Sequence, residues 1–393
     1  MAADNRTEGE HTGKYTPADW TDFVHTAPGT LAGEYLRLFW QPVYCSDELH
    51  PGRSKPITVL NEQFTLYRGE KGEAHLLGFR CAHRGTQLST GWVEGDDLRC
   101  FYHGWKYDST GQCIEQPAEP EPFCQKVKVR SYPTHEYLGL VFAYLGLGEA
   151  PPFPRYPDFE SDGVPQAEMY TRACNYYQDL ENDPVHGAFV HARGRRRPIP
   201  LVTAEESEWG MTAYSTYPDG SVRVTQWGMP NVHLVRTPPS GPDGAWRDTV
   251  HWKVPIDDTT EGSFRVHFSH VTGEAARRLQ EQYEEWRAKG PIFRPESLTA
   301  AILAGEMHIK DTFDQAEFYR TTVEDDVAQM GQGPIVDRTQ DHLGRSDATV
   351  ILFRKLWERE LRALAEGRSL KHWVRTERDV PQDADGLQRA AAL

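Results

Sequence analysis

Two short segments of the chain each pair one cysteine with one histidine, and both residue types are common metal ligands. Cys81 and His83 lie in the first segment, and Cys100 and His103 lie in the second. Zinc sites of this composition usually keep the two cysteines in one segment and the two histidines in the other. One ligand of each kind per segment is the arrangement of a Rieske [2Fe–2S] cluster, in which two thiolates bind one iron and two imidazoles bind the other. We therefore expect such a cluster, with zinc, or buried cysteines beside incidental histidines, as the alternative.

A third segment, Asp183-Pro-Val-His186-Gly-Ala-Phe-Val-His191, adds two histidines and a carboxylate. Two histidines and one carboxylate with open coordination positions form the facial triad of non-haem Fe(II) oxygenases. The two rings are about 140° apart on a regular α-helix, so an irregularity near Gly187 is needed to aim both at one metal. An aspartate before a proline is also typical of a helix start. The segment predicts a mononuclear iron site, against the alternative of ordinary core or surface histidines.

The sequences around these motifs resemble those of the Rieske non-haem iron oxygenases. Cys81-Ala-His-Arg-Gly-Thr-Gln-Leu88 and Cys100-Phe-Tyr-His-Gly-Trp-Lys-Tyr107 are similar to the family's two cluster loops, and Asp-x2-His-x4-His matches its iron motif. Residues 323–329 and 333–344 resemble the C-terminal block of its phthalate-dioxygenase-like subgroup. The resemblance extends over nearly the whole chain from about Pro28.

The resemblance implies roles for individual residues. His186 and His191 would bind the mononuclear iron together with Asp325, because the subgroup's carboxylate ligand lies eight residues before the glycine of Gly333-Pro-Ile. Glu324 and Asp326 are the competitors for the place of Asp325, since a shift of one residue exchanges them.

Asp183 would bridge the cluster ligand His103 of a neighbouring subunit to His186 and so carry electrons to the iron. One departure from the family pattern concerns Asn182, which is about two residues closer to Asp183 than expected. Two residues rotate a helix by about 200°, so Asn182 should not inherit a place beside the iron. Three residues are kept as candidates for the surroundings of the iron: Gln178, Asp179 and Asn182.

The function implied is that of a terminal oxygenase in a multicomponent system. An NAD(P)H-dependent reductase, directly or through a ferredoxin, would supply electrons, and O2 would hydroxylate a small aromatic substrate, by preference an aromatic carboxylate. O- or N-demethylation or ether cleavage is the alternative reaction. A Rieske electron carrier or redox sensor without oxygenase activity is the other alternative, although a carrier needs only about the first 150 residues. A homotrimer, or a hexamer of two stacked trimers, is implied by electron transfer between subunits.

A basic loop follows His191. Its arginines could clamp a substrate carboxylate, dock an acidic reductase, or simply face the solvent. They are Arg193, Arg195, Arg196 and Arg197.

Hydrophobic patterning places these motifs in an α+β chain. Residues 1–27 are expected to form a flexible tail, and the patterning predicts an all-β domain with a first helix within 29–43, followed by a mixed region. The resemblance implies that 28–155 form the Rieske domain and 156–393 a catalytic helix-grip domain with an antiparallel sheet and helices. Proline-rich residues 151–157 mark the boundary. In the second domain, we expect strands at 214–224, 232–236 and 264–270 and helices at 274–289 and 349–366.

Charge and composition exclude several classes of partner. The 393 residues carry 43 basic and 58 acidic side chains, a net charge of −15, which disfavours binding to nucleic acid. The longest apolar stretch, Leu138–Leu147, is too short to span a bilayer, and the N-terminus lacks the apolar core of a signal peptide. We therefore expect a cytoplasmic protein that does not contact membranes. The remaining cysteines are expected to be ordinary thiols: Cys45, Cys113, Cys124 and Cys174.

Overall fold

The computed structural model describes residues 14–182, 185, 198–237, 247–289, 295–312 and 317–376. The N-terminal part consists of α1 (Leu31–Arg37), β1 (Trp40–Cys45), β2 (Arg53–Val59), β3 (Glu62–Arg68), β4 (Ala74–Gly78), β5 (Trp92–Glu94), β6 (Asp97–Arg99), β7 (Lys106–Tyr107), β8 (Cys113–Glu115), β9 (Ser131–Tyr132), β10 (Thr134–Tyr137) and β11 (Leu140–Tyr144). The C-terminal part consists of β12 (Val164–Arg172), α2 (Tyr176–Leu180), β13 (Leu201–Glu206), β14 (Gly210–Thr216), β15 (Val222–Gly228), β16 (Val232–Thr237), β17 (Arg247–Asp257), β18 (Thr260–Ser269), α4 (Gly273–Lys289), α5 (Pro295–Leu303), α6 (Glu317–Met330) and α7 (Ala348–Ala365).

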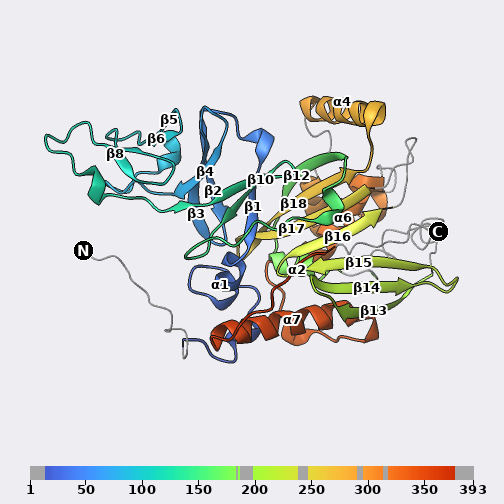
Figure 1. Cartoon of the computed structure of the whole chain (residues 1–393). Coiled ribbons are helices and arrows are strands. Elements are labelled where there is room, and N and C mark those ends of the chain that lie inside the picture. The colour runs from blue at the N-terminus through green and yellow to red at the C-terminus, as the bar shows by residue number, and fades with distance from the viewer. Residues whose placement is uncertain are drawn as a thin grey trace.

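The N-terminal part is built from small antiparallel sheets. Their strand orders are β1-β11-β10, β2-β3-β4-β9 and β5-β6-β7-β8. The β5–β8 sheet lies at the end of the molecule farthest from the C-terminal part (Figure 1). This sheet packs around a small apolar core that is separate from the large one. Cys81 and Cys100 belong to this small core, together with Trp105 and Tyr107. The two cysteine–histidine segments therefore belong to an independent apolar unit.

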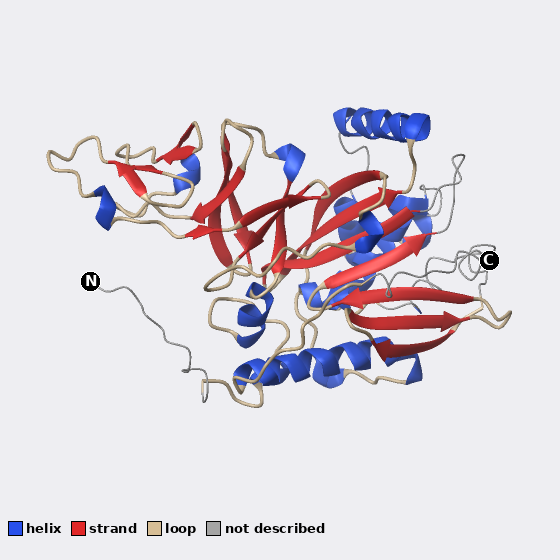
Figure 2. Cartoon of the chain, viewed as in Figure 1, coloured by secondary structure: helices blue, strands red, loops and turns tan. Residues whose placement is uncertain are grey.

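A seven-stranded antiparallel sheet forms the C-terminal part, in the order β12-β18-β17-β16-β15-β14-β13. Helix α2 contacts β17 and β18, and α7 runs along β13 and β14 and reaches α1 (Figures 1 and 2). The two parts also share one large core, in which the rings of Phe142 on β11 and Trp252 on β17 lie 5.3 Å apart. The predicted α+β fold class, a β-rich Rieske part followed by an antiparallel sheet with helices, is confirmed.

Most predicted elements occur, and one differs in extent. The first helix, Leu31–Arg37, lies within the predicted 29–43, and strand β1 starts at Trp40, because Pro42 cannot donate a helical hydrogen bond and the segment pairs with β11. The stretch 214–224, predicted as one strand, holds the end of β14, a turn and the start of β15. No helix in the described part of the chain is long and apolar enough to cross a membrane.

Candidate metal centres

The two cysteine–histidine segments form matching loops. In the first, the amide of Gly85 donates to the carbonyl of Cys81 at 2.9 Å, and in the second, Gly104 donates to Cys100 at 3.1 Å. Both glycines have positive φ angles, +76° and +74°, which residues with a Cβ rarely adopt. Each cysteine thus begins a tight turn closed four residues later by glycine, and each turn carries one histidine.

The loops bring the four predicted cluster ligands together. The rings of His83 and His103 lie 4.7 Å apart, edge to face, and both keep accessible surface. Cys81 and Cys100 are buried, 3% and 2% exposed. Burial raises the pKa of the Cys100 thiol, and the neighbouring Cys81 raises it further. Two inner thiols and two outer imidazoles are the donor set that a Rieske cluster requires, so these residues fit that group.

Aromatic side chains fix the orientation of these ligands. The ring of Trp105 stacks on His83 with centroids 4.4 Å apart and planes 6° apart. The hydroxyl of Tyr107 lies 3.1 Å from the Sγ of Cys81. Burial and then His83 and Arg84 lower the pKa of His103, which favours the neutral imidazole that binds metal. The cluster loops therefore carry outer contacts of the kind that orient metal ligands.

Large aromatic side chains are exposed next to the second loop. Trp92, Phe101 and Tyr102 are 52%, 58% and 54% exposed. Trp92 and Phe101 contact each other with ring centroids 5.7 Å apart, and Tyr102 lies against His103 at 3.8 Å. Contiguous exposed aromatic surface of this kind is typical of a protein contact site.

Only part of the predicted mononuclear iron site lies within the described residues. Asp183, His186 and His191 lie outside them, as does the basic loop of Arg193, Arg195, Arg196 and Arg197. No three described His, Cys, Asp or Glu side chains surround a single metal ion. The cluster ligands are a different case, because a Rieske cluster takes only two residues at each of its irons.

Asp325, the predicted carboxylate ligand, lies on α6. The Nδ2 of Asn182 donates to its Oδ1 at 3.2 Å. This contact contradicts the expectation that Asn182 points away from the ligands, because α2 ends at Leu180 and the rotation of a regular helix no longer applies at residue 182. The competitors Glu324 and Asp326 are buried, 1% and 3% exposed, and Asp326 accepts from the Nε of Arg172 at 2.8 Å.

The other two candidates from α2 make different contacts. Gln178 holds the segment after α6, because its Nε2 donates to the carbonyls of Gln329 and Gly333, each at 3.0 Å, and its Oε1 accepts from the amide of Val336 at 2.9 Å. Asp179 is buried in a network of charges with Arg172. Gln178 thus ties α2 to the segment after α6, and Asp179 ties α2 to β12.

Sequence analysis missed several buried charged and titratable residues on the sheet. Arg172, Lys253 and Glu261 are at most 2% exposed and lie next to α2 and α6. Burial lowers the pKa of His233 to about 3, with Lys253 adding to this effect, and Asp179 and Asp325 oppose it. The sequence did hold a signal for these residues, because they are charged residues at strand positions whose side chains face the core.

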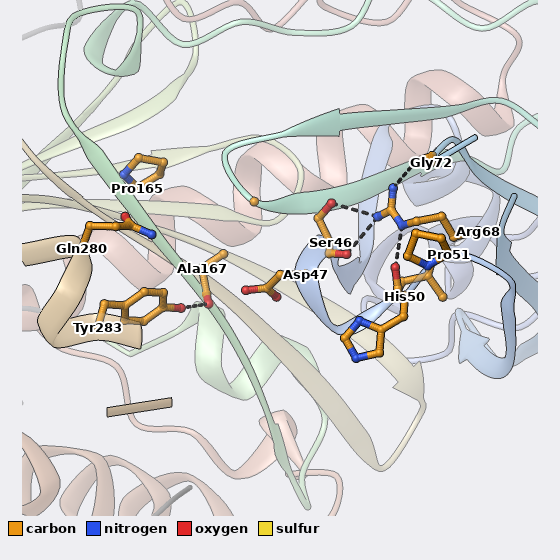
Figure 3. Close-up of a pocket in the computed structure, with 12 residues that line it drawn as sticks. Ser46, Asp47, His50, Pro51, Arg68, Gly72, Pro165, Ala167, Gln280 and Tyr283 are labelled. Carbon is orange, nitrogen blue, oxygen red and sulfur yellow. Dashed lines mark hydrogen bonds between the residues drawn. The ribbon is translucent and has the colours of Figure 1, made fainter. Parts of the chain in front are cut away.

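A cavity of about 530 Å³ lies away from both centres, between the segment Ser46–Leu49, strand β12 and helix α4 (Figure 3). The guanidinium of Arg68 on its wall already donates to the carbonyls of Ser46, Leu49 and Gly72. Tyr283 donates to the carbonyl of Ala167 at 2.6 Å. None of the predicted site residues lines this cavity.

Comparison with known proteins agrees with the geometry. Residues 39–133 match the Rieske [2Fe-2S] domain. The chain is 31% identical over 373 residues to the 5,5'-dehydrodivanillate O-demethylase oxygenase subunit of Sphingobium sp. (strain NBRC 103272 / SYK-6), covering 90% of this chain and 82% of that one. It is 26% identical to the phthalate 4,5-dioxygenase oxygenase subunit of Pseudomonas putida, covering 86% of this chain and 84% of that one.

Solved structures share the fold. The terminal oxygenase of carbazole 1,9a-dioxygenase from Nocardioides aromaticivorans IC177 superposes with a TM-score of 0.63 at 20% identity, covering 85% of this chain and 99% of that one. An oxygenase and ferredoxin complex of carbazole 1,9a-dioxygenase gives the same TM-score at 21% identity, covering 91% and 99%. The sequence-based assignments of family and enzyme class are confirmed: the chain belongs to the Rieske oxygenases and is similar to their oxygenase subunits, among them that of a phthalate dioxygenase.

Proposed function

We propose that this oxygenase subunit is the terminal component of a cytoplasmic system that uses O2 and electrons from NAD(P)H to hydroxylate an aromatic substrate. A reductase, directly or through a ferredoxin, supplies the electrons. The observation that carries the proposal is the convergence of two thiols and two imidazoles on matched glycine-closed loops. This convergence occurs in a chain whose full-length relatives include oxygenase subunits.

In this proposal, Cys81 and Cys100 hold one iron of the cluster, and His83 and His103 hold the other. When bound, the cluster supplies single electrons and the mononuclear iron supplies O2 activation. The ring of Trp105 keeps His83 in place, and the hydroxyl of Tyr107 donates to the Cys81 sulfur.

The mononuclear iron is assigned to His186, His191 and Asp325. The contacts of α6 favour Asp325 over its neighbours, because Asp326 is already bonded to the buried guanidinium of Arg172. Residues one apart on a helix point about 100° apart, so Asp325 and Asp326 do not serve the same site. The amide of Asn182 orients the Asp325 carboxylate through its 3.2 Å hydrogen bond.

Asp183 is assigned to electron transfer from His103 of a neighbouring subunit to His186. The exposed aromatic surface of Trp92, Phe101 and Tyr102 beside His103 supports a protein contact at this end of the molecule. The resemblance to the family implies a homotrimer, or a hexamer of two stacked trimers, and a closed ring of this kind lets each cluster meet the next subunit's iron.

The substrate is assigned to the aromatic carboxylates. A relative named as a phthalate dioxygenase supports ring hydroxylation, and a relative named as a dehydrodivanillate O-demethylase supports removal of a methyl group from an aromatic carboxylate as the second candidate. Both reactions use the same metal centres, so only the chemical identity of the products distinguishes ring hydroxylation from demethylation.

A single-turnover experiment tests the proposal. The iron-loaded protein is reduced under argon and mixed with O2 and each of a panel of phthalates, phenoxybenzoate and methoxybenzoates. We expect one compound to accelerate the return of the cluster's visible absorbance and to yield an oxygenated or demethylated product. Asp325→Ala is the control, since it should keep the cluster spectrum and form no product. Reoxidation at one rate with every compound, and no product, would favour the electron carrier instead.

A further inference from the structure

A buried charge network joins α2 and α6 to the seven-stranded sheet. We call it the α2–α6 network. Each member is at most 6% exposed, and the six members come from five different elements. The members are Arg172 (β12), Asp179 (α2), Lys253 (β17), Glu261 (β18), and Asp326 and Gln329 (α6).

Arg172 is the centre of the network, because its guanidinium bonds to both helices at once. Its Nε donates to Oδ1 of Asp326 at 2.8 Å, and its Nη1 lies 2.6 Å from Oδ2 of Asp179. The same Nη1 lies 3.2 Å from Oε1 of Glu261 and donates to Oε1 of Gln329. The Nη2 donates to the hydroxyl of Tyr170. The planar fork of arginine suits such a set of contacts, which the single ammonium of lysine cannot reproduce.

The charges of the network balance if one carboxyl keeps its proton. Burial and the neighbouring Asp179 raise the pKa of Glu261 well above its usual range. Burial opposes ionisation of Asp179 as well, but Arg172 and Lys253 outweigh it and lower the pKa of that carboxyl. Arg172 and Lys253 then face two carboxylates, Asp179 and Asp326. Buried ions are tolerated only when they are paired in this way.

The network adjoins the proposed iron site on both helices. Asp326 is the neighbour of Asp325 on α6, and Asp179 lies four residues before Asp183. Gln329 on α6 donates through Nε2 to Oδ1 of Asp179 at 3.1 Å, which ties the helices to each other directly. The position of α2 relative to α6 is thus fixed by contacts that do not involve the metal.

We propose that Arg172 is a positioning residue for the mononuclear iron, because it sets the separation between α6, which carries Asp325, and α2, which leads into Asp183 and His186. This inference rests on the proposed function. Without the guanidinium, Asp179 and Asp326 lose their shared partner and repel each other. The separation between α6, which carries Asp325, and the end of α2 is then no longer fixed before iron binds.

Iron binding in the cluster-containing protein tests the proposal. Arg172→Met removes the guanidinium, and Arg172→Lys keeps the charge without the fork. The control is Arg375→Met. Arg375 is also buried, 4% exposed, and its guanidinium pairs with Asp158 and donates to Gln226, neither of which lies on α2 or α6. Both methionine variants therefore break a buried ion pair, but only Arg172→Met removes a contact with α2 and α6.

The measurements are Fe(II) titration under argon and the electron paramagnetic resonance spectrum of the iron–nitric oxide adduct. The absorbance of the cluster per chain reports on folding. We expect Arg172→Met to weaken iron binding about 10–100-fold with an altered adduct spectrum, the range seen when an outer partner of a metal ligand is lost. Arg172→Lys should lie between it and wild type, and Arg375→Met should bind iron as wild type does.

Equal iron affinity in wild type and Arg172→Met, or an equal loss in Arg172→Met and Arg375→Met, would overturn the positioning role. If wild type itself binds no iron beyond the cluster, the proposed function fails instead. Should Arg172→Met not fold, Gln329→Met decides the matter. It breaks the link to Asp179 and leaves no unpaired charge, so we expect weaker iron binding, and an unchanged affinity contradicts the proposal.

Discussion

The hydroxyl of Tyr107, 3.1 Å from the Cys81 sulfur, is the single contact that most directly affects the cluster. A hydrogen bond to a ligand sulfur stabilises the reduced, more negative state and raises the reduction potential. Tyr107→Phe removes about 1 kcal/mol of this stabilisation, which lowers a one-electron potential by on the order of 40 mV. Redox titration followed by circular dichroism measures the change.

Tyr67→Phe is the matched control for this prediction. Tyr67 belongs to the same small core and is fully buried, but its hydroxyl donates to the carbonyl of Asp96 at 2.9 Å and does not reach the cluster loops. Its loss should leave the potential at the wild-type value. If Tyr107→Phe and Tyr67→Phe shift the reduction potential equally, the shift comes from altered packing. The hydrogen bond to the Cys81 sulfur would then not be its cause.

His233 is a buried histidine whose protonation destabilises the folded chain. Its folded pKa is about 3, because its ring is buried against Trp227, from which its centroid is 4.6 Å. In the unfolded chain the pKa is about 6.5, so the unfolded state takes up a proton first as the pH falls. Stability from this residue is complete above about pH 6.5 and falls by about 1.4 kcal/mol per pH unit below it, until about pH 3.

Urea unfolding of the chelator-treated protein at pH 7.5 and 5.5, followed by tryptophan fluorescence, measures this loss. His233→Gln should lose about 1.4 kcal/mol less than wild type between the two pH values. His342→Gln, at an exposed position, controls for the removal of a histidine in general. An identical loss in wild type and His233→Gln would contradict the assignment.

The cluster segments could be predicted from sequence because their ligands lie close together in the chain. The α2–α6 network could not be, because Arg172 meets Asp326 across 154 residues and Glu261 across 89. A buried charge is acceptable only with its partner, and sequence alone does not identify that partner. Glu324 and Asp326 are both buried, although acidic residues in a run are more often exposed.

Helix α7 is the element that ties the two parts of the molecule together. Its Trp357 is fully buried, donates to the carbonyl of Pro230 at 3.0 Å, and lies edge to face on Tyr35 of α1 at 5.3 Å. Trp357→Ala should cost about 3–5 kcal/mol of stability, because it leaves a cavity between α1 and the sheet.

Urea unfolding followed by both cluster absorbance and tryptophan fluorescence tests this expectation. Both midpoints should fall together, since α7 contacts α1 as well as β13 and β14. Trp373→Ala, at a partly buried position beyond the helix, should cost much less. A shift confined to one of the two signals would show that α7 stabilises only one part.

Helices whose apolar periodicity stops where the helix stops were predicted well. Strands whose alternation of apolar and polar residues continues into the next strand were not. The helices at 274–289 and 349–366 match α4 and α7 to within one residue at each end. The hairpin of β14 and β15 was predicted as one strand because its alternation continues through the turn at Pro218-Asp-Gly220, where Gly220 has a φ of +85°. That turn sequence was the missed signal.

At the scale of the whole molecule, the proposed function requires that electrons leave one subunit and enter the next. His103→Ala removes a proposed cluster ligand and leaves the iron site, and Asp325→Ala removes a proposed iron ligand and leaves the cluster. Each variant alone should be inactive. Coexpressed in equal amounts, they form mixed trimers in which about a quarter of all subunits pair an intact iron site with a neighbour's intact cluster. We therefore expect about a quarter of wild-type turnover.

Transfer within one chain predicts a different result, because no chain in the mixture then has both centres and turnover stays at zero. The double variant His103→Ala, Asp325→Ala coexpressed with Asp325→Ala is the control, since no subunit then has an intact iron site. Mixing the two purified single variants without unfolding adds a second control, because assembled trimers do not exchange subunits quickly. Recovery in coexpressed protein alone would show that electrons pass between subunits.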